Sequence, residues 1–454
     1  MTRAERFVHG ALLALVVGLA LHNAAMAQLF ELGVRGTALD VLAAWKEALL
    51  AAGVAVAAWS LRRRPAVRLA DLLALAYAAA VLAYAVLPQA WLEGEATARG
   101  ELLALRHHLL PVGGYLLGRL LGGLVGGRAR LGGAIALTAA AAALIGLLDL
   151  GLVSLQAWRD SGVPGWYREQ LGLAYEGLSG LPENWVYNTG DEQNPIRRLV
   201  STFLSPLASA YLFLVALLYV ASRPLRWWWS LLGLLLYVAL LYTHTRAAFG
   251  ALAAGLLVLA LAQRRLAPAV LAGATLAVAA AFLAVYPTLG PTTSYTSEEL
   301  QWLRENAERE PGASGDPFSG SEASTRSHWR NLREGVEAVV RHPQGYGLGN
   351  AGVAAKRTGV EIRAGESTYT ELGVDVGVAG LAAFVLWSLA LLRALWRREA
   401  WLAAALAAVL LLGLQTDVVG VHWLAVVVWA AAGLALARPL GRGQAEEASA
   451  PAGS

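Results

Sequence analysis

The sequence predicts an all-α integral membrane protein with about twelve transmembrane helices and a large, partly helical periplasmic loop before the last three helices. Three observations carry this prediction. Of 454 residues, 57% are hydrophobic and only 15% are charged, a composition too apolar for an ordinary soluble surface. Apolar runs of membrane-spanning length recur along the chain. Basic residues gather in alternate connections between these runs, as they do on the cytoplasmic side of membrane proteins.

The apolar runs define the predicted spans, because a helix is the spanning form that satisfies its own backbone polar groups in lipid. The first run follows a basic start and ends near Ala25-Met26-Ala27, which also resembles a cleavable signal peptide; we favour a retained helix. The predicted spans are 7–28, 38–61, 67–88, 101–124, 131–153, 201–221, 226–243, 246–263, 267–286, 367–392, 400–415 and 419–437.

Arginines orient the spans. Lys46 and Lys356 are the only lysines, so the net charge of +4 comes almost wholly from arginine in short loops, a pattern that does not suggest nucleic-acid binding. By the positive-inside rule both termini are cytoplasmic. The residues that mark this side are Arg3, Arg6, Arg62, Arg63, Arg64, Arg68, Arg128, Arg130, Arg223, Arg226, Arg264, Arg265, Arg393, Arg397, Arg398, Arg438 and Arg442.

We expect one membrane domain over residues 1–440 and a disordered cytoplasmic tail over 441–454, which is small and polar. Two long connections, about 154–200 and 287–366, fall on the outer side, where function is expected to gather. An amphipathic helix near 325–341 is expected to lie over the membrane domain. Its apolar stripe is Trp329, Leu332, Val336, Val339 and Val340.

Arginines on the outer side predict an anion site. Each one alone could equally be a solvated or headgroup-facing side chain. Together they could clamp a diphosphate, because guanidinium groups are permanently charged, bidentate donors that stabilise a phosphate leaving group without a metal. The candidates are Arg197 and Arg198 before Ser201-Thr202-Phe203, Arg246 at a helix start, and Arg326, Arg330 and Arg333 at helical spacing.

Glu366 is the candidate catalytic base. It precedes a membrane helix on the outer side, where the helix dipole favours an ionised carboxylate, and it could accept a proton from a sugar hydroxyl. It could instead pair with an arginine and do no chemistry. Glu371, with Thr368, fits a helix-capping box. The segment 345–350 is glycine-rich but lacks the flanking signature of a nucleotide loop, so we interpret it as a structural turn.

Charged residues inside the predicted spans are expected to find structural partners on other helices. This applies to Lys46 and Glu47, whose side chains point in different directions around their helix. His107 and His108 lack ligand companions at metal-binding spacing, and the chain has no cysteine. No metal or cofactor is therefore expected.

Three segments resemble the O-antigen ligase and O-antigen polymerase superfamily: RRLVSTFLSPLASA at 197–210, THTRAAFGALAAG at 243–255, and STRSHWRNLREGVEAVVRHPQGYGLGNAG at 324–352 continuing to GESTYTELGVDVGVAG at 365–380. The resemblance covers the second half well and the first half only by topology. Members of this superfamily are inner-membrane glycosyltransferases that act at the periplasmic face.

The resemblance implies a donor glycan linked to undecaprenyl diphosphate, a glycan or glycolipid acceptor, and metal-independent transfer with inversion. It carries diphosphate-binding roles onto Arg197 or Arg198, Arg246 and Arg326. Glu366-Ser367 stands where the lipopolysaccharide ligases have His-Asn or His-Ser, so the base role falls to Glu366 and a polymerase stays open beside a ligase.

A different class of function remains open from the sequence, namely a membrane transporter of a small anion or lipid-linked glycan; a third reading is a structural scaffold for envelope assembly. Geometry separates them. An enzyme should gather its arginines and Glu366 at an outward cavity, a transporter should place its polar residues near the midplane, and a scaffold should show no convergent site.

Overall fold

The computed structural model describes residues 2–60, 66–124, 129–187, 194–309, 318–320 and 322–437. Within these ranges the chain is overwhelmingly helical, as predicted. The one sheet among the described residues is an antiparallel pair, in which β1 (Val186–Tyr187) pairs with β2 (Ile196–Arg197). The expected tail at 441–454 and several of the loop arginines lie outside the described residues.

The first half of the chain forms helices along each predicted span, with short helical elements between them. The helices are α1 (Arg3–Glu31), α2 (Gly36–Ala43), α3 (Trp45–Ser60), α4 (Leu69–Tyr84), α5 (Ala98–Leu124) and α6 (Ala129–Leu152). The shorter elements are η1 (Gln89–Trp91), α7 (Leu155–Arg159), α8 (Val163–Gly165), η2 (Trp166–Gln170), η3 (Glu183–Trp185) and η4 (Ser201–Phe203).

The second half contributes ten further helices within the described ranges. They are α9 (Pro206–Ala221), α10 (Trp227–Tyr242), α11 (Arg246–Gln263), α12 (Ala267–Leu289), α13 (Ser297–Arg309), α14 (Ala323–Arg341), α15 (Gly352–Thr358), α16 (Thr368–Trp396), α17 (Ala400–Leu412) and α18 (His422–Leu436), of which α15 is a short surface helix.

Six helices or helix pairs are long and apolar enough to cross a membrane: α1, α2 with α3, α6, α11, α12 and α16. Five more are apolar but shorter, namely α4, α9, α10, α17 and α18. The remaining predicted span is α5, which has 27 residues and carries charged side chains. A multi-pass membrane protein is thus supported by helix length and composition, although these do not establish the number twelve.

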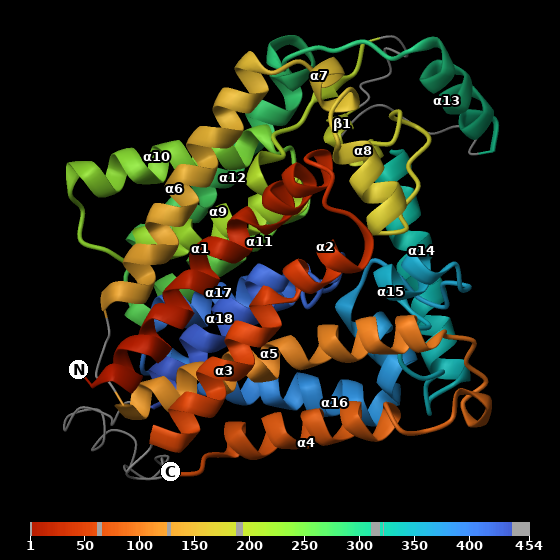
Figure 1. The fold of residues 1–454 in the computed structure, drawn as a ribbon. Helices are drawn as coiled ribbons and strands as arrows, with labels where there is room; N and C mark the ends of the chain where they lie inside the picture. The colour runs from red at the N-terminus through yellow and green to blue at the C-terminus, as the bar shows by residue number, and fades with distance from the viewer. Residues whose placement is uncertain are drawn as a thin grey trace.

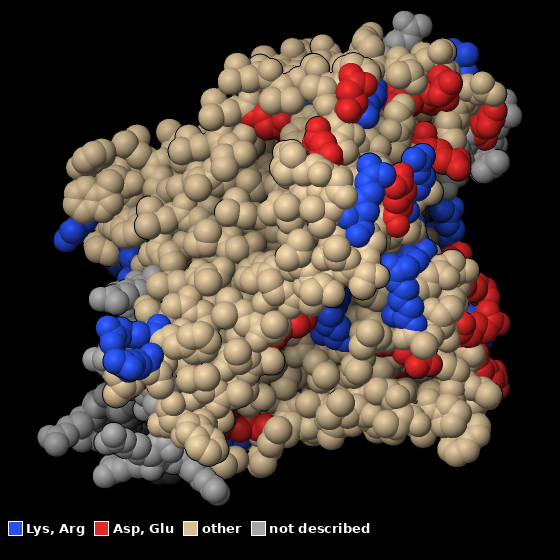
Figure 2. All heavy atoms as spheres, viewed as in Figure 1, with Lys and Arg blue, Asp and Glu red and all other residues tan. Residues whose placement is uncertain are grey.

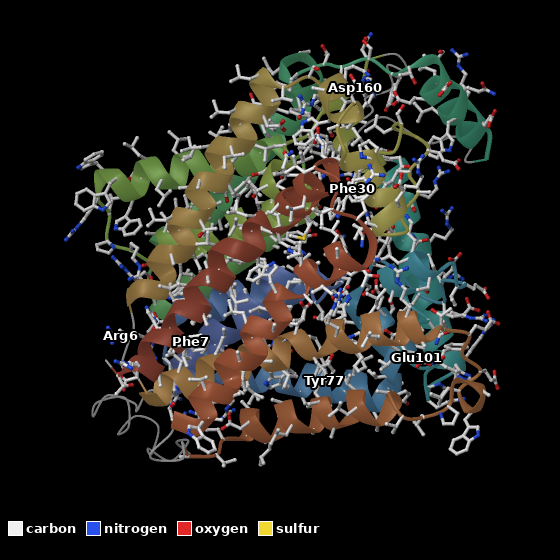
Figure 3. All side chains as sticks on the ribbon, in the orientation of Figure 1. Arg6, Phe7, Phe30, Tyr77, Glu101 and Asp160 are labelled. Atoms are coloured by element: carbon white, nitrogen blue, oxygen red, sulfur yellow. The ribbon has the colours of Figure 1, made fainter. Side chains whose placement is uncertain are left out.

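The helices run between two ends of the molecule. Figure 1 shows α1 beginning at the left, whereas α13 and α14 lie on the right side of the molecule. Arg6 lies at the left end in Figure 3, and Glu101 and Asp160 lie toward the right and top. Acidic and basic side chains gather at that right side in Figure 2, while the broad face between the ends is nearly free of them. This charge distribution is the one expected of a membrane domain with one large polar end.

Glycines set the closest helix contact in the core, between α5 and α18. A Cβ atom added at Gly114 would lie 2.5 Å from the Val426 carbonyl oxygen, and one at Gly118 would lie 1.9 Å from the Ala430 carbonyl oxygen. The two backbones therefore touch because neither glycine has a side chain, the usual solution for close packing in lipid. This contact holds α5, which carries His107 and His108, against α18.

The helix α14 packs on α16 by part of the predicted apolar stripe together with a glycine outside it. Val339 of the stripe packs against Gly373, and Gly335 faces Thr370. By contrast Trp329 and Val340 of the stripe are 66% and 72% exposed. Only part of the predicted stripe therefore faces the membrane domain. Glycine widens the contact, because it lets helix backbones approach where bulky side chains would hold them apart.

Candidate functional site

A cavity of about 1110 Å³ lies at the polar end of the helices. Its wall is built from α1, α2, α3, α5, η2, the start of α9, α14, α15, and the connections before α16 and α18. Glu366 is the one predicted site residue on this wall. The charged and histidine side chains that line it are His22, Asp40, Lys46, Arg99, Arg106, His107, Glu334, Lys356, Arg357, Arg363, Glu366, Glu371, Asp417 and His422.

Glu366 lies in the connection between α15 and α16, with a partner on α14. Its backbone has φ of 62°, a left-handed conformation that is rare for a residue with a side chain and that often marks functional sites. Its Oε2 atom is 2.6 Å from Nδ1 of His328. This contact holds the pKa of Glu366 below its usual range, against burial, which raises it; Asn331 and Arg330 lower it further. Glu366 is therefore an ionised carboxylate beside an imidazole at neutral pH.

Arg246, the first residue of α11, fixes the start of α14. Its Nη2 atom is 2.7 Å from Oε2 of Glu322, and the same carboxylate accepts a hydrogen bond of 2.8 Å from the backbone N–H of Thr325. Glu322 thus caps α14 while paired with Arg246. Burial raises the pKa of Glu322, but the hydrogen bonds and charge of Arg246 and the hydrogen bonds from Thr325 together outweigh burial, and the pKa is lowered. The pair is charged, and it joins α11 to α14.

Arg198 lies in the same corner. Its Nε donates to the Thr243 carbonyl at 2.8 Å and its Nη2 to Thr245 Oγ1 at 3.2 Å. Burial lowers the pKa of Arg198 to about 10, so the side chain stays charged at neutral pH. Burial, with help from Arg198 and Arg246, lowers the pKa of His244 to about 3. The corner is therefore positive, with a neutral imidazole inside it.

Arg197, the residue before Arg198, makes its contacts outside this corner. Its Nη2 atom is 3.4 Å from Oδ2 of Asp149 on α6, its Nη1 donates to the Val153 carbonyl, and its own carbonyl accepts a hydrogen bond from Tyr286 on α12. The side chain is buried. Arg197 thus ties α6 to α12, and the structure does not bring it to the cavity.

Arg326 and Arg330 follow Glu322 along α14. They are one turn apart, so they lie on the same side of the helix, and Arg330 is close enough to Glu366 to lower its pKa. Six residues separate Glu322 from His328, which is about 9 Å along a helix. A single helix therefore connects the Arg246 corner to Glu366. We call the Arg198, Arg246, Arg326 and Arg330 side chains the arginine corner.

Glu371 is a site residue that the sequence interpretation missed. The residue before α16 is Ser367, and its side chain makes no capping bond, so the predicted capping box of Thr368 and Glu371 does not form. Glu371 is buried instead, and a Cβ atom at Gly352 would lie 2.1 Å from its Oε2. A capping box is a local pattern, whereas the glycine that makes room for this carboxylate is nineteen positions earlier in the chain.

Two histidine–aspartate pairs lie next to Glu371. Nε2 of His107 is 2.8 Å from Oδ2 of Asp417, and Nε2 of His108 is 2.8 Å from Oδ2 of Asp375. Burial raises the pKa of Asp417, but His107 outweighs it and the pKa is lowered. The sequence could not pair these residues, because the aspartates lie about 270 to 310 positions further along the chain.

Lys46 and Glu47 have partners on other helices, as predicted, but the expectation that they would not pair with each other is wrong. Nζ of Lys46 is 3.1 Å from Nε2 of His22 on α1 and 3.6 Å from Oε1 of Glu47. The same Glu47 oxygen is 3.4 Å from Nε of Arg106 on α5. These contacts form a charged cluster whose members His22, Lys46 and Arg106 line the cavity.

The glycine-rich segment 345–350 is the structural turn that the sequence predicts. Gly345, Gly347 and Gly349 have positive φ. Asn350 closes the turn, with its side chain donating to the carbonyls of residues 346 and 347 and its backbone N–H donating to Asp375 at 3.2 Å. The turn therefore seats the aspartate that holds His108.

A comparison with known families matches residues 231–385 to the family described as O-antigen ligase. The match runs from α10 into α16 and includes Arg246, Arg326 and Glu366. It confirms the resemblance to the O-antigen ligase and polymerase superfamily that the sequence motifs carry. A search of curated proteins found no match.

Proposed function

We propose that this chain is a glycosyltransferase that moves a glycan from an undecaprenyl-diphosphate-linked donor to an acceptor hydroxyl at the outer face of the cytoplasmic membrane. The observation that carries the proposal is the position of α14. It starts at the Arg246–Glu322 pair and, two turns later, holds His328 against Glu366 at the cavity wall. The match to the O-antigen ligase family supports glycosyl transfer as the type of reaction.

The arginine corner is the proposed site for the donor diphosphate. Guanidinium groups give bidentate hydrogen bonds to phosphate oxygens and keep their charge when partly buried. Nη2 of Arg246 is 2.7 Å from Glu322, and this ion pair fixes the guanidinium group at the start of α14. As the bond between the sugar and the diphosphate breaks, negative charge grows on the leaving oxygens. The arginines offset that charge, and the proposed reaction needs no metal ion.

Glu366 is the proposed proton acceptor. The acceptor hydroxyl oxygen attacks the anomeric carbon, the bond from that carbon to the diphosphate oxygen breaks, and the hydroxyl proton passes to the Glu366 carboxylate. A single displacement of this kind inverts the anomeric configuration. A carboxylate that is already ionised can act at neutral pH, and His328 keeps Glu366 in that form by lowering its pKa.

One observation favours the transporter instead. Lys46, His22 and Arg106 line the cavity and fall within predicted spans, and ionisable residues within membrane spans often mark a transport path. A transporter would move the donor across the membrane with its diphosphate bond intact. An enzyme would release free undecaprenyl diphosphate.

The test replaces Glu366 by Gln, which keeps the shape of the side chain and removes the base. Transfer should fall by about 100-fold or more, the usual contribution of a positioned general base, and Arg246→Gln should show a loss of similar size. Arg168→Gln is the matched control, because Arg168 is 72% exposed and contacts only its neighbour Glu169 among the ion pairs found in the described ranges. Wild-type turnover in both Glu366→Gln and Arg246→Gln would refute the proposal.

A further inference from the structure

A second group of basic side chains lines the cavity, apart from the arginine corner. Arg99 and Arg106 lie on α5, Lys46 on α3 and Arg357 on α15, and all four are on the cavity wall. Arg99 and Arg106 are seven residues apart, so they lie on one face of α5, two turns from each other. Three separate elements therefore direct four cations toward one space. We call these four residues the basic wall.

The basic wall has fewer acidic partners than cations. Glu47 is shared, with its Oε1 atom 3.6 Å from Lys46 and 3.4 Å from Arg106. Arg357 donates from Nε to the Leu171 carbonyl at 2.8 Å, and Asp40 is the acid near it. Among the described residues, two carboxylates thus serve four cations. The other acids of the cavity wall include Glu366 and Asp417, each of which already contacts a histidine.

The arginines of the basic wall act on one another. Burial, followed by the charges of Arg106 and Arg99, lowers the pKa of Arg357 to about 10. The Nε atom of Arg106 is buried, and its 3.4 Å contact with Glu47 does not have the geometry of a hydrogen bond. Gathering like charges is costly, and a buried donor that makes no hydrogen bond adds to that cost. An anion placed between these side chains would remove both penalties.

We propose that the basic wall is a second anion subsite, which binds a phosphate group carried by the acceptor. Tetrahedral phosphate suits the arrangement, because its oxygens can take hydrogen bonds from several directions and arginine is well shaped to give them. Apolar side chains continue the wall beside the cations, including Met26, Leu102 and Leu103. The ligand class is therefore a phosphorylated amphiphile, such as a phosphorylated glycolipid.

The subsite rests on the proposed glycosyl transfer, and it indicates on which side of Glu366 each substrate would bind. Glu366 shares the cavity with the basic wall, whereas Arg246 and Arg326 are not part of the cavity wall. An acceptor held by its phosphate on α3, α5 and α15 can present a hydroxyl to Glu366. The donor diphosphate approaches the same residue from the arginine corner. The two substrates would then be held by two separate sets of cations, with the base between them.

The test measures phosphate binding without turnover, on full-length protein in phosphatidylcholine nanodiscs. One arm titrates inorganic phosphate, and the other adds phosphatidic acid, which carries a phosphate on a lipid. The variants are Arg106→Gln, Arg357→Gln and their combination. Each should bind about tenfold more weakly or worse, since a hydrogen bond to a charged group is worth at least that much. Arg168→Gln should bind as the wild type does.

Each outcome decides a point. Weakened binding in either arm supports the subsite, and the arm that responds identifies a lipid or a free anion as the source of the phosphate. If Arg106→Gln and Arg357→Gln fail to fold, the same binding measurement is made on Arg99→Gln, since Arg99 is exposed. Equal binding by wild type and variants in both arms overturns the subsite. Loss of transfer in Glu366→Gln would then still support glycosyl transfer, so the two proposals fail separately.

Discussion

At the scale of single residues, the account depends on the Glu366–His328 pair. The sequence places a glutamate where related ligases carry a histidine. The structure brings a histidine to that glutamate from α14, 2.6 Å away. The site thus contains both a carboxylate and an imidazole, but the imidazole comes from α14 and the carboxylate stands at the position where the ligases have histidine. We infer that His328 is a positioning residue, since it contacts the base and sets its ionisation.

Replacing His328 by Phe should shift the acid limb of the pH profile of kcat/KM to higher pH. In the wild type, His328 holds the pKa of Glu366 below its usual range, so the base stays ionised until the pH falls below that range. Without His328, only the smaller effects of Asn331 and Arg330 oppose burial, so the pKa rises and Glu366 takes up its proton at a higher pH. Initial rates measured across the acidic range check this shift.

The conservative variant His328→Gln keeps a donor for the carboxylate and should restore most of the wild-type profile. An unshifted acid limb in His328→Phe would show that His328 does not set the ionisation of the base. A merely structural histidine would lower activity equally at every pH.

The residue types of the site could be predicted from the sequence, but most of their contacts could not. Arg246 and Glu366 stand in loops at helix starts, where local patterns are informative. Glu322, Asp375 and Asp417 meet their partners across 76, 267 and 310 positions respectively. Without an alignment nothing in a single sequence links such positions, so the pairs emerge only once the helices are packed.

At the scale of elements, two helices determine the site. The helix α14, with its capping residue Glu322, carries Arg326, His328 and Arg330. Its predicted range agrees with the structure, and its predicted contact face agrees only in part, through Val339. The helix α5 brings His107, His108 and Arg106 into the bundle. Its contact with α18 depends on glycines. A sequence can show that small residues line one face of a span, but it does not show which helix packs on that face.

The substitution Gly118→Val should destabilise the membrane domain by about 3 kcal/mol or more, because the added Cβ would overlap the backbone of α18 rather than a movable side chain. Thermal unfolding of the purified protein in detergent measures the effect. The matched control is Gly250→Ala on α11, where a Cβ meets nothing within 4 Å. Equal stability of both variants would show that α5 and α18 are not in backbone contact.

At the scale of the whole molecule, membrane topology places the site. The described residues separate into a mostly apolar body and one highly charged end, as Figure 2 shows. Arginine alternation in the sequence predicts the same division. It also assigns the charged end to the outer side, and that orientation is a prediction with its own test.

Single cysteines can report the orientation, because the chain has none of its own. Gln301→Cys on α13 should react with a membrane-impermeant maleimide in spheroplasts, since α13 belongs to the predicted outer loop. Leu225→Cys, at a position 93% exposed between α9 and α10, should react only after the membrane is permeabilised. The reverse pattern would place the cavity on the cytoplasmic side and exclude a periplasmic reaction.

The most direct test of glycosyl transfer uses purified protein in liposomes with a radiolabelled undecaprenyl-diphosphate-linked glycan and a glycolipid acceptor. The account predicts that labelled glycan appears on the acceptor while free undecaprenyl diphosphate accumulates in equal amount, and that Glu366→Gln stops both together. Movement of the intact labelled donor across the bilayer, with no free undecaprenyl diphosphate formed, would contradict the account and identify a transporter.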